Sequence, residues 1–173
     1  MKGRVFEMRR GMFVLLGLGA ALGLIAGSAL ATPVINATAQ TAMGPLVDRP
    51  LAVNWKFDPG TRIKLQTKGE VKVAFQRITI GAGGTLGWHS HPGPTVVTVF
   101  QGTLSFYHAE DCTEEIEFPT GTSFSNLPDE IHLARNEGAG DVVLFAVYFV
   151  PQSITTPPQL RIDQPLPAPG CPQ

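Results

Sequence analysis

Between residues 60 and 150, turns rich in glycine and proline divide the chain into short apolar stretches, and this spacing restricts the fold more than any other feature. Helical spacing of apolar residues is nearly absent after residue 50. Strands are predicted at 95–100, 103–108, 114–118, 122–125, 132–135 and 142–150, after alternating segments at 62–66 and 71–80. Short strands at such regular spacing predict an all-β fold, as a sandwich or a barrel.

One of the alternating segments changes its phase. Val71, Val73 and Phe75 are apolar in one phase, whereas Ile78 and Ile80 are apolar in the opposite phase. Successive side chains of a strand point to opposite faces, so a strand that keeps its apolar side chains on one face needs an extra residue here. The pattern therefore predicts a β-bulge between Phe75 and Ile78.

The first 31 residues have the three parts of an export signal. Four basic residues precede an uncharged stretch at 11–31, which closes with Ala29-Leu30-Ala31. This order predicts a signal peptide that is cut after Ala31, with Ala37-Thr38-Ala39 as a second exit. A stretch of about 20 apolar residues also spans a bilayer, so an uncleaved membrane anchor stays open as an alternative. We expect a secreted or periplasmic protein that touches a membrane only through this segment.

The remaining chain is long enough for one domain with one core. Residues 32–55 are predicted to be a linker, because they contain several prolines and small polar residues. Residues 56–150 are predicted to form a β-barrel, and residues 151–173 a proline-rich tail. Lys and Arg number 13 against 14 Asp and Glu, and no basic run follows the N-terminus. This balance excludes an electrostatic grip on nucleic acid.

Both cysteines, Cys112 and Cys171, lie in the part of the chain that would be exported. An oxidising compartment permits a disulfide between them. Such a bridge would hold the tail against the barrel, because the tail has too few apolar residues to fold by itself. Two unpaired thiols are the alternative, and a cysteine metal site is disfavoured because no Cys-x-x-Cys spacing exists.

Three histidines indicate a metal site. His89 and His91 are two residues apart, so in a strand both imidazoles point to the same face. His132 lies on another predicted strand. Three neutral imidazoles from two strands suit a borderline divalent ion, namely Fe, Mn, Zn, Ni, Co or Cu. The alternative is a set of hydrogen-bonded core histidines without a metal ion.

The frame around these histidines resembles the cupin superfamily. The first cupin motif is a glycine, five residues, His-x-His, three or four residues, a glutamate, six residues and a glycine. Gly83, His89-Ser90-His91, Thr95 and Gly102 match its spacing. Gly121, His132 and Asn136 match the spacing of the second motif, which has the order Gly, Pro-x-Gly, His and Asn.

The resemblance implies a double-stranded β-helix, or jelly-roll barrel, with a metal ion inside and a small-molecule ligand or substrate. It also implies homodimer formation, and dioxygenase, isomerase or lyase chemistry. His89, His91 and His132 are the metal ligands that it implies. Inward-facing residues such as Phe106 and Tyr148 are expected to line the cavity.

Two departures from the motifs bear on the site. Thr95 stands where the family has its glutamate ligand, and Leu127-Pro128-Asp129 replaces the Pro-x-Gly turn. Thr95 is therefore expected only to line the site. Without the carboxylate, a divalent ion on three neutral histidines leaves a charge of +2, which favours an anionic ligand. Glu130, two residues before His132, is a candidate fourth ligand, although a solvated turn residue is the alternative.

Two functions follow from these residues. The first is a metal-dependent enzyme, such as a three-histidine dioxygenase or isomerase, acting on a small molecule. The second is a non-catalytic exported module that binds a small ligand or a metal. No second acid or base is evident beside the histidines, so the sequence leaves both functions open.

Overall fold

A computed structural model of the chain describes residues 30–46, 50–58 and 60–173, and this part is almost entirely β. The strands are β1 (Ile35–Pro45), β2 (Ala52–Lys56), β3 (Arg62–Gln66), β4 (Val71–Thr85), β5 (His89–Ser90), β6 (Thr95–Gln101), β7 (Thr103–His108), β8 (Ile116–Pro119), β9 (Ser123–Asn126), β10 (His132–Arg135), β11 (Val142–Pro151) and β12 (Ile162–Asp163). The short 3-10 helix Pro157–Leu160 precedes β12. The expected all-β fold is confirmed.

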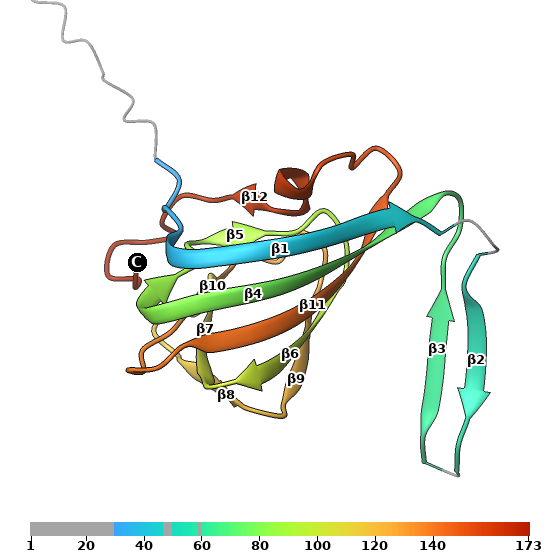
Figure 1. Cartoon of the computed structure of the whole chain (residues 1–173), viewed down its shortest axis with the longest axis horizontal. Coiled ribbons are helices and arrows are strands. Elements are labelled where there is room, and N and C mark those ends of the chain that lie inside the picture. The colour runs from blue at the N-terminus through green and yellow to red at the C-terminus, as the bar shows by residue number, and fades with distance from the viewer. Residues whose placement is uncertain (1–29, 47–49, 59) are drawn as a thin grey trace, which may run out of the picture.

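Ten of these strands form one antiparallel sheet that curls into a barrel (Figure 1). One wall has the order β1-β4-β11-β6-β9, and the other has the order β12-β5-β10-β7-β8. The walls join where Arg135 of β10 pairs with Thr85 of β4. The predicted central strand, β11, pairs with β4 on one side and β6 on the other. This arrangement is the jelly roll that the sequence predicts.

The core fills the space between the walls. Its buried apolar side chains come from alternate positions of the strands: Ala74, Ile78, Ile80, Val97, Val99, Leu104, Phe106, Ala134, Leu144, Ala146 and Tyr148. Burial of this apolar area is the main driving force for closing the barrel. The three histidines border this core, so the apolar packing also fixes their surroundings.

The predicted bulge in the 71–80 segment is wrong. β4 pairs with β11 without a register shift from Val71 to Ile80. Ala74, Ile78 and Ile80 face the core in one phase, whereas Phe75 is 55% exposed on the outer face. The apolar pattern changes phase because the inward position between Ala74 and Ile78 holds a polar residue, Gln76, which hydrogen-bonds inside the barrel.

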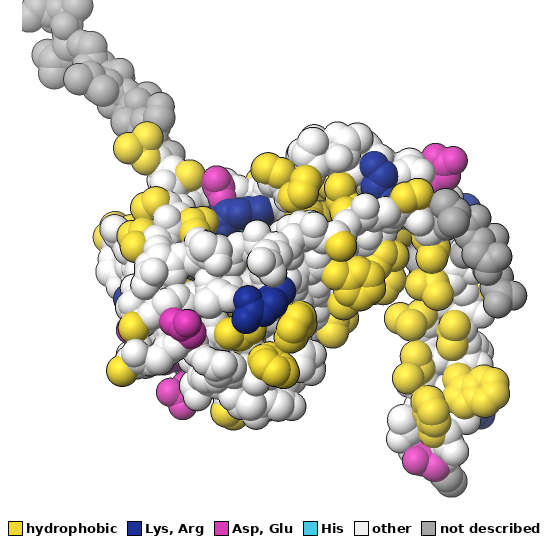
Figure 2. All heavy atoms as spheres, in the orientation of Figure 1, with side chains coloured by type: hydrophobic (Ala, Val, Ile, Leu, Met, Phe, Trp, Pro, Cys, Tyr) yellow, Lys and Arg dark blue, Asp and Glu magenta, His cyan; other side chains and the backbone are white. Residues whose placement is uncertain are grey.

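The expected linker at 32–55 and the expected start of the barrel at residue 56 are also wrong. Residues 35–45 form β1, which pairs with β4 and completes one wall. Residues 52–56 and 62–66 pair only with each other, as the two-stranded hairpin β2–β3. The hairpin projects from the barrel and carries exposed apolar side chains (Figures 1 and 2). Strand β1 has few bulky apolar residues, which is why its sequence resembles a linker.

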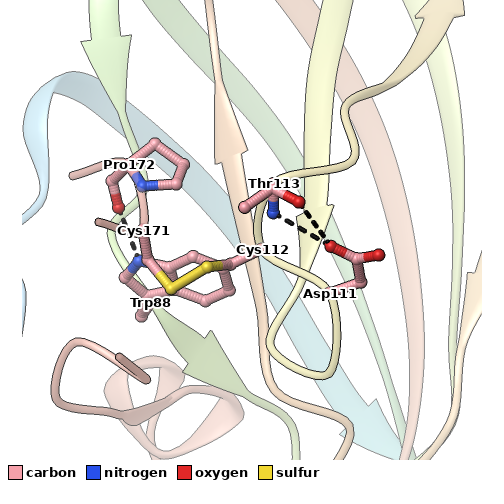
Figure 3. Close-up of a disulfide and its surroundings, with 6 residues drawn as sticks. All are labelled: Trp88, Asp111, Cys112, Thr113, Cys171 and Pro172. Atoms are coloured by element: carbon pink, nitrogen blue, oxygen red, sulfur yellow. Dashed lines mark hydrogen bonds between the residues drawn. A yellow bond between two sulfur atoms is a disulfide. The ribbon is translucent and has the colours of Figure 1, made fainter. Parts of the chain in front are cut away.

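The proline-rich tail is part of the barrel wall. Ile162 and Asp163 pair with Ser90 and His89 of β5. Cys112 and Cys171 are joined by a disulfide, with a Cα–Cα distance of 5.3 Å (Figure 3). Beside it, the Trp88 indole N–H donates to the carbonyl oxygen of Pro172 at 2.8 Å. These contacts hold the tail against β5, which carries His89.

Among the described residues, no helix has the length and apolar character needed to cross a membrane. The predicted signal peptide or anchor at residues 1–31 lies almost wholly outside the described part of the chain.

Candidate metal centre

The three predicted metal ligands meet inside the barrel. His89 lies on β5, His91 directly follows this strand, and His132 begins β10 opposite His89 in the pairing of the two strands. One ring nitrogen from each histidine lies within 4.8 Å of the others, and all three side chains are buried. The separations between the ring centroids are 4.4 to 5.1 Å. The structure thus brings together the three residues that the sequence singled out.

A backbone carbonyl orients each imidazole. The Nδ1–H of His89 donates to the carbonyl oxygen of Gly87 at 2.8 Å. The Nδ1–H of His91 donates to that of Leu160 at 2.8 Å, and the Nδ1–H of His132 donates to that of Glu130 at 2.9 Å. A carbonyl oxygen only accepts, so each Nδ1 carries the proton and each Nε2 keeps its lone pair. Hydrogen bonds of this kind fix the tautomer and ring orientation of metal-binding histidines.

The electrostatic surroundings keep the three imidazoles neutral. Burial lowers the pKa of His89 well below its usual value, and the other two histidines and Arg161 add to this shift. Burial also lowers the pKa of His91 and takes the pKa of His132 down to about 3. A neutral imidazole is the form that binds a metal ion. At neutral pH no proton therefore competes for the Nε2 atoms.

These features fit a borderline divalent ion. The donors are three neutral imidazole nitrogens, held in place by their own hydrogen bonds and surrounded by apolar core residues. Zinc, iron and copper sites are built from such ligands. Three protein ligands leave at least one coordination position for water or a substrate.

Two cavities adjoin the histidines. The inner one, of about 30 Å³, lies among the three rings and the apolar core. The outer one, of about 410 Å³, opens between β1, β4 and the tail, and His89 and His91 form part of its lining. The outer pocket has the size of a small-molecule site. A small molecule bound in this pocket would lie beside His89 and His91.

The three expected lining residues differ in their positions. Tyr148 contributes to both cavities, and its ring centroid lies 5.2 Å from that of His91. Burial raises the pKa of Tyr148, and its hydroxyl donates to Gln76 Oε1 at 2.7 Å. Phe106 lines only the inner cavity and stacks on His132. Thr95 is buried but is not part of the lining of either cavity.

The structure does not support Glu130 as a fourth ligand. One carboxylate oxygen lies 2.8 Å from His108 Nδ1, and the other accepts the backbone N–H of Leu127 at 2.7 Å. The carboxylate is therefore engaged in the 127–130 turn, and only the backbone carbonyl of Glu130 supports the site. The alternative interpretation of Glu130 as a turn residue agrees with these contacts.

Two residues of the site were missed by the sequence analysis. Asn126 at the end of β9 is buried, and its Nδ2 lies 3.4 Å from His132 Nε2. Arg161, in the tail, lines the outer pocket. Its sequence position offered one signal, because Arg161 and Asp163 are the only charged residues between 151 and 173.

Comparisons with known proteins add a likeness in fold. No family model matches the chain, and no curated protein matches it. Among solved structures, an oxalate oxidase is 20% identical, with a TM-score of 0.40. The match covers 44% of this chain and 41% of the oxalate oxidase. The chain therefore spans less than half of that protein.

Two further structures match a larger share of their own length. A predicted oxalate decarboxylase from Thermotoga maritima matches 48% of this chain and 82% of its own, with 22% identity and a TM-score of 0.38. A cupin superfamily protein from Desulfitobacterium hafniense is 12% identical, with a TM-score of 0.41. The match covers 60% of this chain and 80% of that protein. The jelly-roll walls and the three converging histidines are the fold and the ligand positions that the resemblance to the two cupin motifs implies.

Proposed function

We propose that this protein is an exported metal-dependent enzyme that acts on a small organic molecule in the outer pocket. One observation carries the proposal: three oriented, neutral histidines meet beside a pocket of about 410 Å³. A bound divalent ion would act there as a Lewis acid and would lower the pKa of a water molecule or substrate group that it binds. Dioxygenase or isomerase chemistry is the finer form of the proposal.

The protein's own residues would position the substrate. Gln76 accepts a hydrogen bond from the Tyr148 hydroxyl and donates one to Thr41 Oγ1 at 2.9 Å. These hydrogen bonds fix the three side chains along the pocket. Apolar side chains such as Ile78 and Leu160 form much of the remaining wall. They would exclude water from the face of the substrate that lies away from the metal ion.

A non-catalytic binding module is the second candidate, and one observation favours it. Among the described residues, Asp163 is the only one with a carboxylate in the lining of the outer pocket, and it forms an ion pair with Arg161. Tyr148 stays protonated because burial raises its pKa. The described pocket therefore offers no free side chain as a general base, and catalysis would depend on the metal ion itself.

Metal analysis followed by turnover assays separates the two candidates. Protein purified without added metal is expected to contain about one divalent ion per chain, and His89→Ala and His132→Ala are each expected to lose it. His108→Ala is the matched control, because His108 is absent from the converging group. Metal content that is unchanged in both ligand variants would refute the site.

Oxygen uptake against a panel of small phenols and thiols then tests catalysis. Substrate-dependent uptake that disappears in His132→Ala supports the oxygenase form of the proposal. Isomerase activity is assayed on the same panel by following the loss of substrate without oxygen uptake. Stoichiometric metal with neither reaction favours the binding module.

Export is proposed from the basic and apolar N-terminal sequence, and the Cys112–Cys171 disulfide is consistent with an oxidising compartment. Strand β1 favours the first predicted exit over the second, because a cut after Ala39 would remove residues 35–39, four of which pair with β4. Intact-mass analysis of the mature protein is expected to show Thr32 as the first residue.

A further inference from the structure

The tail fixes Arg161 beside the histidine centre. The preceding residue, Leu160, is buried, and its carbonyl oxygen accepts the Nδ1–H of His91. The next two residues pair with β5, where Asp163 lies opposite His89. Arg161 is therefore flanked on both sides by backbone contacts to two of the predicted metal ligands.

The guanidinium of Arg161 is only partly used by the protein. Its Nε donates to the carboxylate of Asp163. Its Nη2 is buried, yet no hydrogen-bond acceptor lies within reach of it in the described part of the chain. A buried, charged donor without a partner is costly, so the position favours an acceptor that a ligand brings.

Pairing with Asp163 does not account for Arg161 by itself. The side chain of Asp163 is 57% exposed, whereas that of Arg161 is only 22% exposed. An ion pair so open to solvent contributes little to stability. It does, however, hold the guanidinium in one orientation, which leaves the Nη edge for another partner.

The charge of Arg161 reaches the centre of the site. Arg161 lines the same outer pocket as His89 and His91. A divalent ion on neutral histidines adds +2 close by. The guanidinium and the metal ion would then both lie at the same pocket, and both attract an anionic ligand.

The remaining pocket wall indicates the rest of the ligand. Much of it is apolar and comes from β1, β4 and the 3-10 helix, including Ala37, Ile78, Pro158 and Leu160. Inorganic phosphate or sulfate would leave these side chains without a contact. An organic acid would place its carboxylate on the guanidinium and its carbon skeleton on the apolar wall.

We propose that Arg161 is a specificity-determining residue that selects a small organic carboxylate for the pocket beside the metal centre. This inference rests on the proposed function, since it names the substrate class of the same site. It also assigns a role to the C-terminal tail, which carries the residue that recognises the carboxylate.

Calorimetric titration with benzoate and with benzamide, its neutral amide analogue, tests the inference on the Co(II)-loaded full-length protein. Benzoate is expected to bind about tenfold more tightly or better, because its carboxylate accepts charge-assisted hydrogen bonds from the guanidinium and the neutral amide does not. Acetate is expected to bind more weakly than benzoate, because it lacks the apolar body. Equal affinities for benzoate and benzamide would overturn the proposal.

Three variants assign the effect to the residue. Arg161→Gln is expected to abolish the preference for benzoate while it leaves Co(II) stoichiometry unchanged. Arg77→Gln is the matched control, because it removes the same charge from an exposed position outside the pocket. Arg161→Lys keeps the charge but loses the planar guanidinium. It is expected to weaken the binding of benzoate but not that of benzamide. A preference that persists in Arg161→Gln, or benzoate affinity unchanged in Arg161→Lys, would overturn the assignment.

Failure of the metal proposal would look different. Wild-type protein that does not take up Co(II) would refute the metal centre only. The same benzoate and benzamide titrations on metal-free protein, with the same variants, would then decide the role of Arg161. Loss of the benzoate preference in Arg161→Gln supports the carboxylate site there too, and no preference in the wild type refutes it.

Discussion

Asn126 lies directly opposite Thr95 in the pairing of β9 with β6, and its amide reaches to 3.4 Å from Nε2 of His132. Thr95 occupies the position at which the cupin motif has its glutamate ligand. A buried amide from the neighbouring strand thus lies across from the position of that missing carboxylate. Its Oδ1 is buried and has no hydrogen-bond partner in the described chain.

We predict that Asn126 supports metal binding through its amide oxygen. The two ends of an amide exchange by rotation. Two atoms that bind one ion at ~2.1 Å lie roughly 3.0–3.4 Å apart, which agrees with the spacing to His132. Asn126→Ala is expected to weaken Co(II) binding by about tenfold or more and to shift the visible absorption bands. Asn126→Asp is expected to retain or strengthen binding.

Ser125→Ala is the control for Asn126, since Ser125 is the adjacent exposed residue of the same strand. Affinity and absorption bands that are the same in Asn126→Ala as in the wild type would show that the amide is no ligand.

A second prediction restores the missing carboxylate. Thr95→Glu would bury a carboxylate at a position with no exposed surface, so the metal-free protein is expected to lose stability. A bound divalent ion would pair with this carboxylate and recover the loss. Thermal unfolding with and without Zn(II) is therefore expected to differ more for Thr95→Glu than for the wild type. Thr98→Glu, on the exposed face of β6, is the control. A Zn(II) effect of wild-type size in Thr95→Glu would contradict the prediction.

The sequence was sufficient for the histidines and insufficient for the residues that surround them. His89, His91 and His132 belong to a local spacing that alternation in a strand converts directly into a shared face. Arg161 is held at the site by the Cys112–Cys171 disulfide and by the two-residue strand β12. Neither feature produces a recognisable pattern in the sequence around Arg161. Asn126 depends on the register between β6 and β9, which no single segment determines.

The same reasoning explains the errors in the fold. Strand β11 is almost wholly apolar, so its central position could be predicted. Strand β1 contributes mainly small side chains, and only Ala37 and Met43 pack against the core, so it lacked the apolar alternation of a strand. Gln76 breaks the apolar phase of β4 because it serves a polar contact with Tyr148. A polar residue on an inner face, such as Gln76, therefore misleads a prediction that relies on the apolar phase alone.

The third prediction concerns pH and the metal-free protein. The pKa values of His89, His91 and His132 are below 6.5 in the folded state, with that of His132 at about 3. Between these values and about 6.5 the unfolded chain binds more protons, so stability falls as pH falls through that window. Each histidine contributes up to about 1.4 kcal/mol per pH unit to the slope.

Urea unfolding in EDTA from pH 7.5 to pH 4 measures this slope. His132→Asn is expected to have a shallower pH dependence than the wild type. Thr103→Asn, at an exposed position of β7 without a titratable side chain, is the control and is expected to keep the wild-type slope. Equal slopes for wild type and His132→Asn would contradict a neutral, buried His132.

The fourth prediction concerns homodimer formation through the β2–β3 hairpin. One face of the hairpin presents exposed apolar side chains, namely Val53, Trp55, Phe57, Ile63 and Leu65. A two-stranded hairpin is at best marginally stable alone in water, so a second copy of the chain is the expected cover. Sedimentation velocity is expected to show a dimer that Trp55→Ser weakens. Lys64→Ser, on the opposite face, is the control, and a monomeric wild type would refute the prediction.

The last prediction connects the disulfide to the metal centre. Cys171→Ser opens a loop whose ends are 59 residues apart, and the chain-entropy estimate for such a loop is about 4 kcal/mol of unfolding free energy. The freed tail would also loosen the Leu160 carbonyl that orients His91, so Co(II) affinity is expected to fall together with stability. Cys112→Ser removes the same bridge from the other side and is expected to match. If both variants lose stability but bind Co(II) as the wild type does, then β12 and Leu160 hold the tail in place without the disulfide.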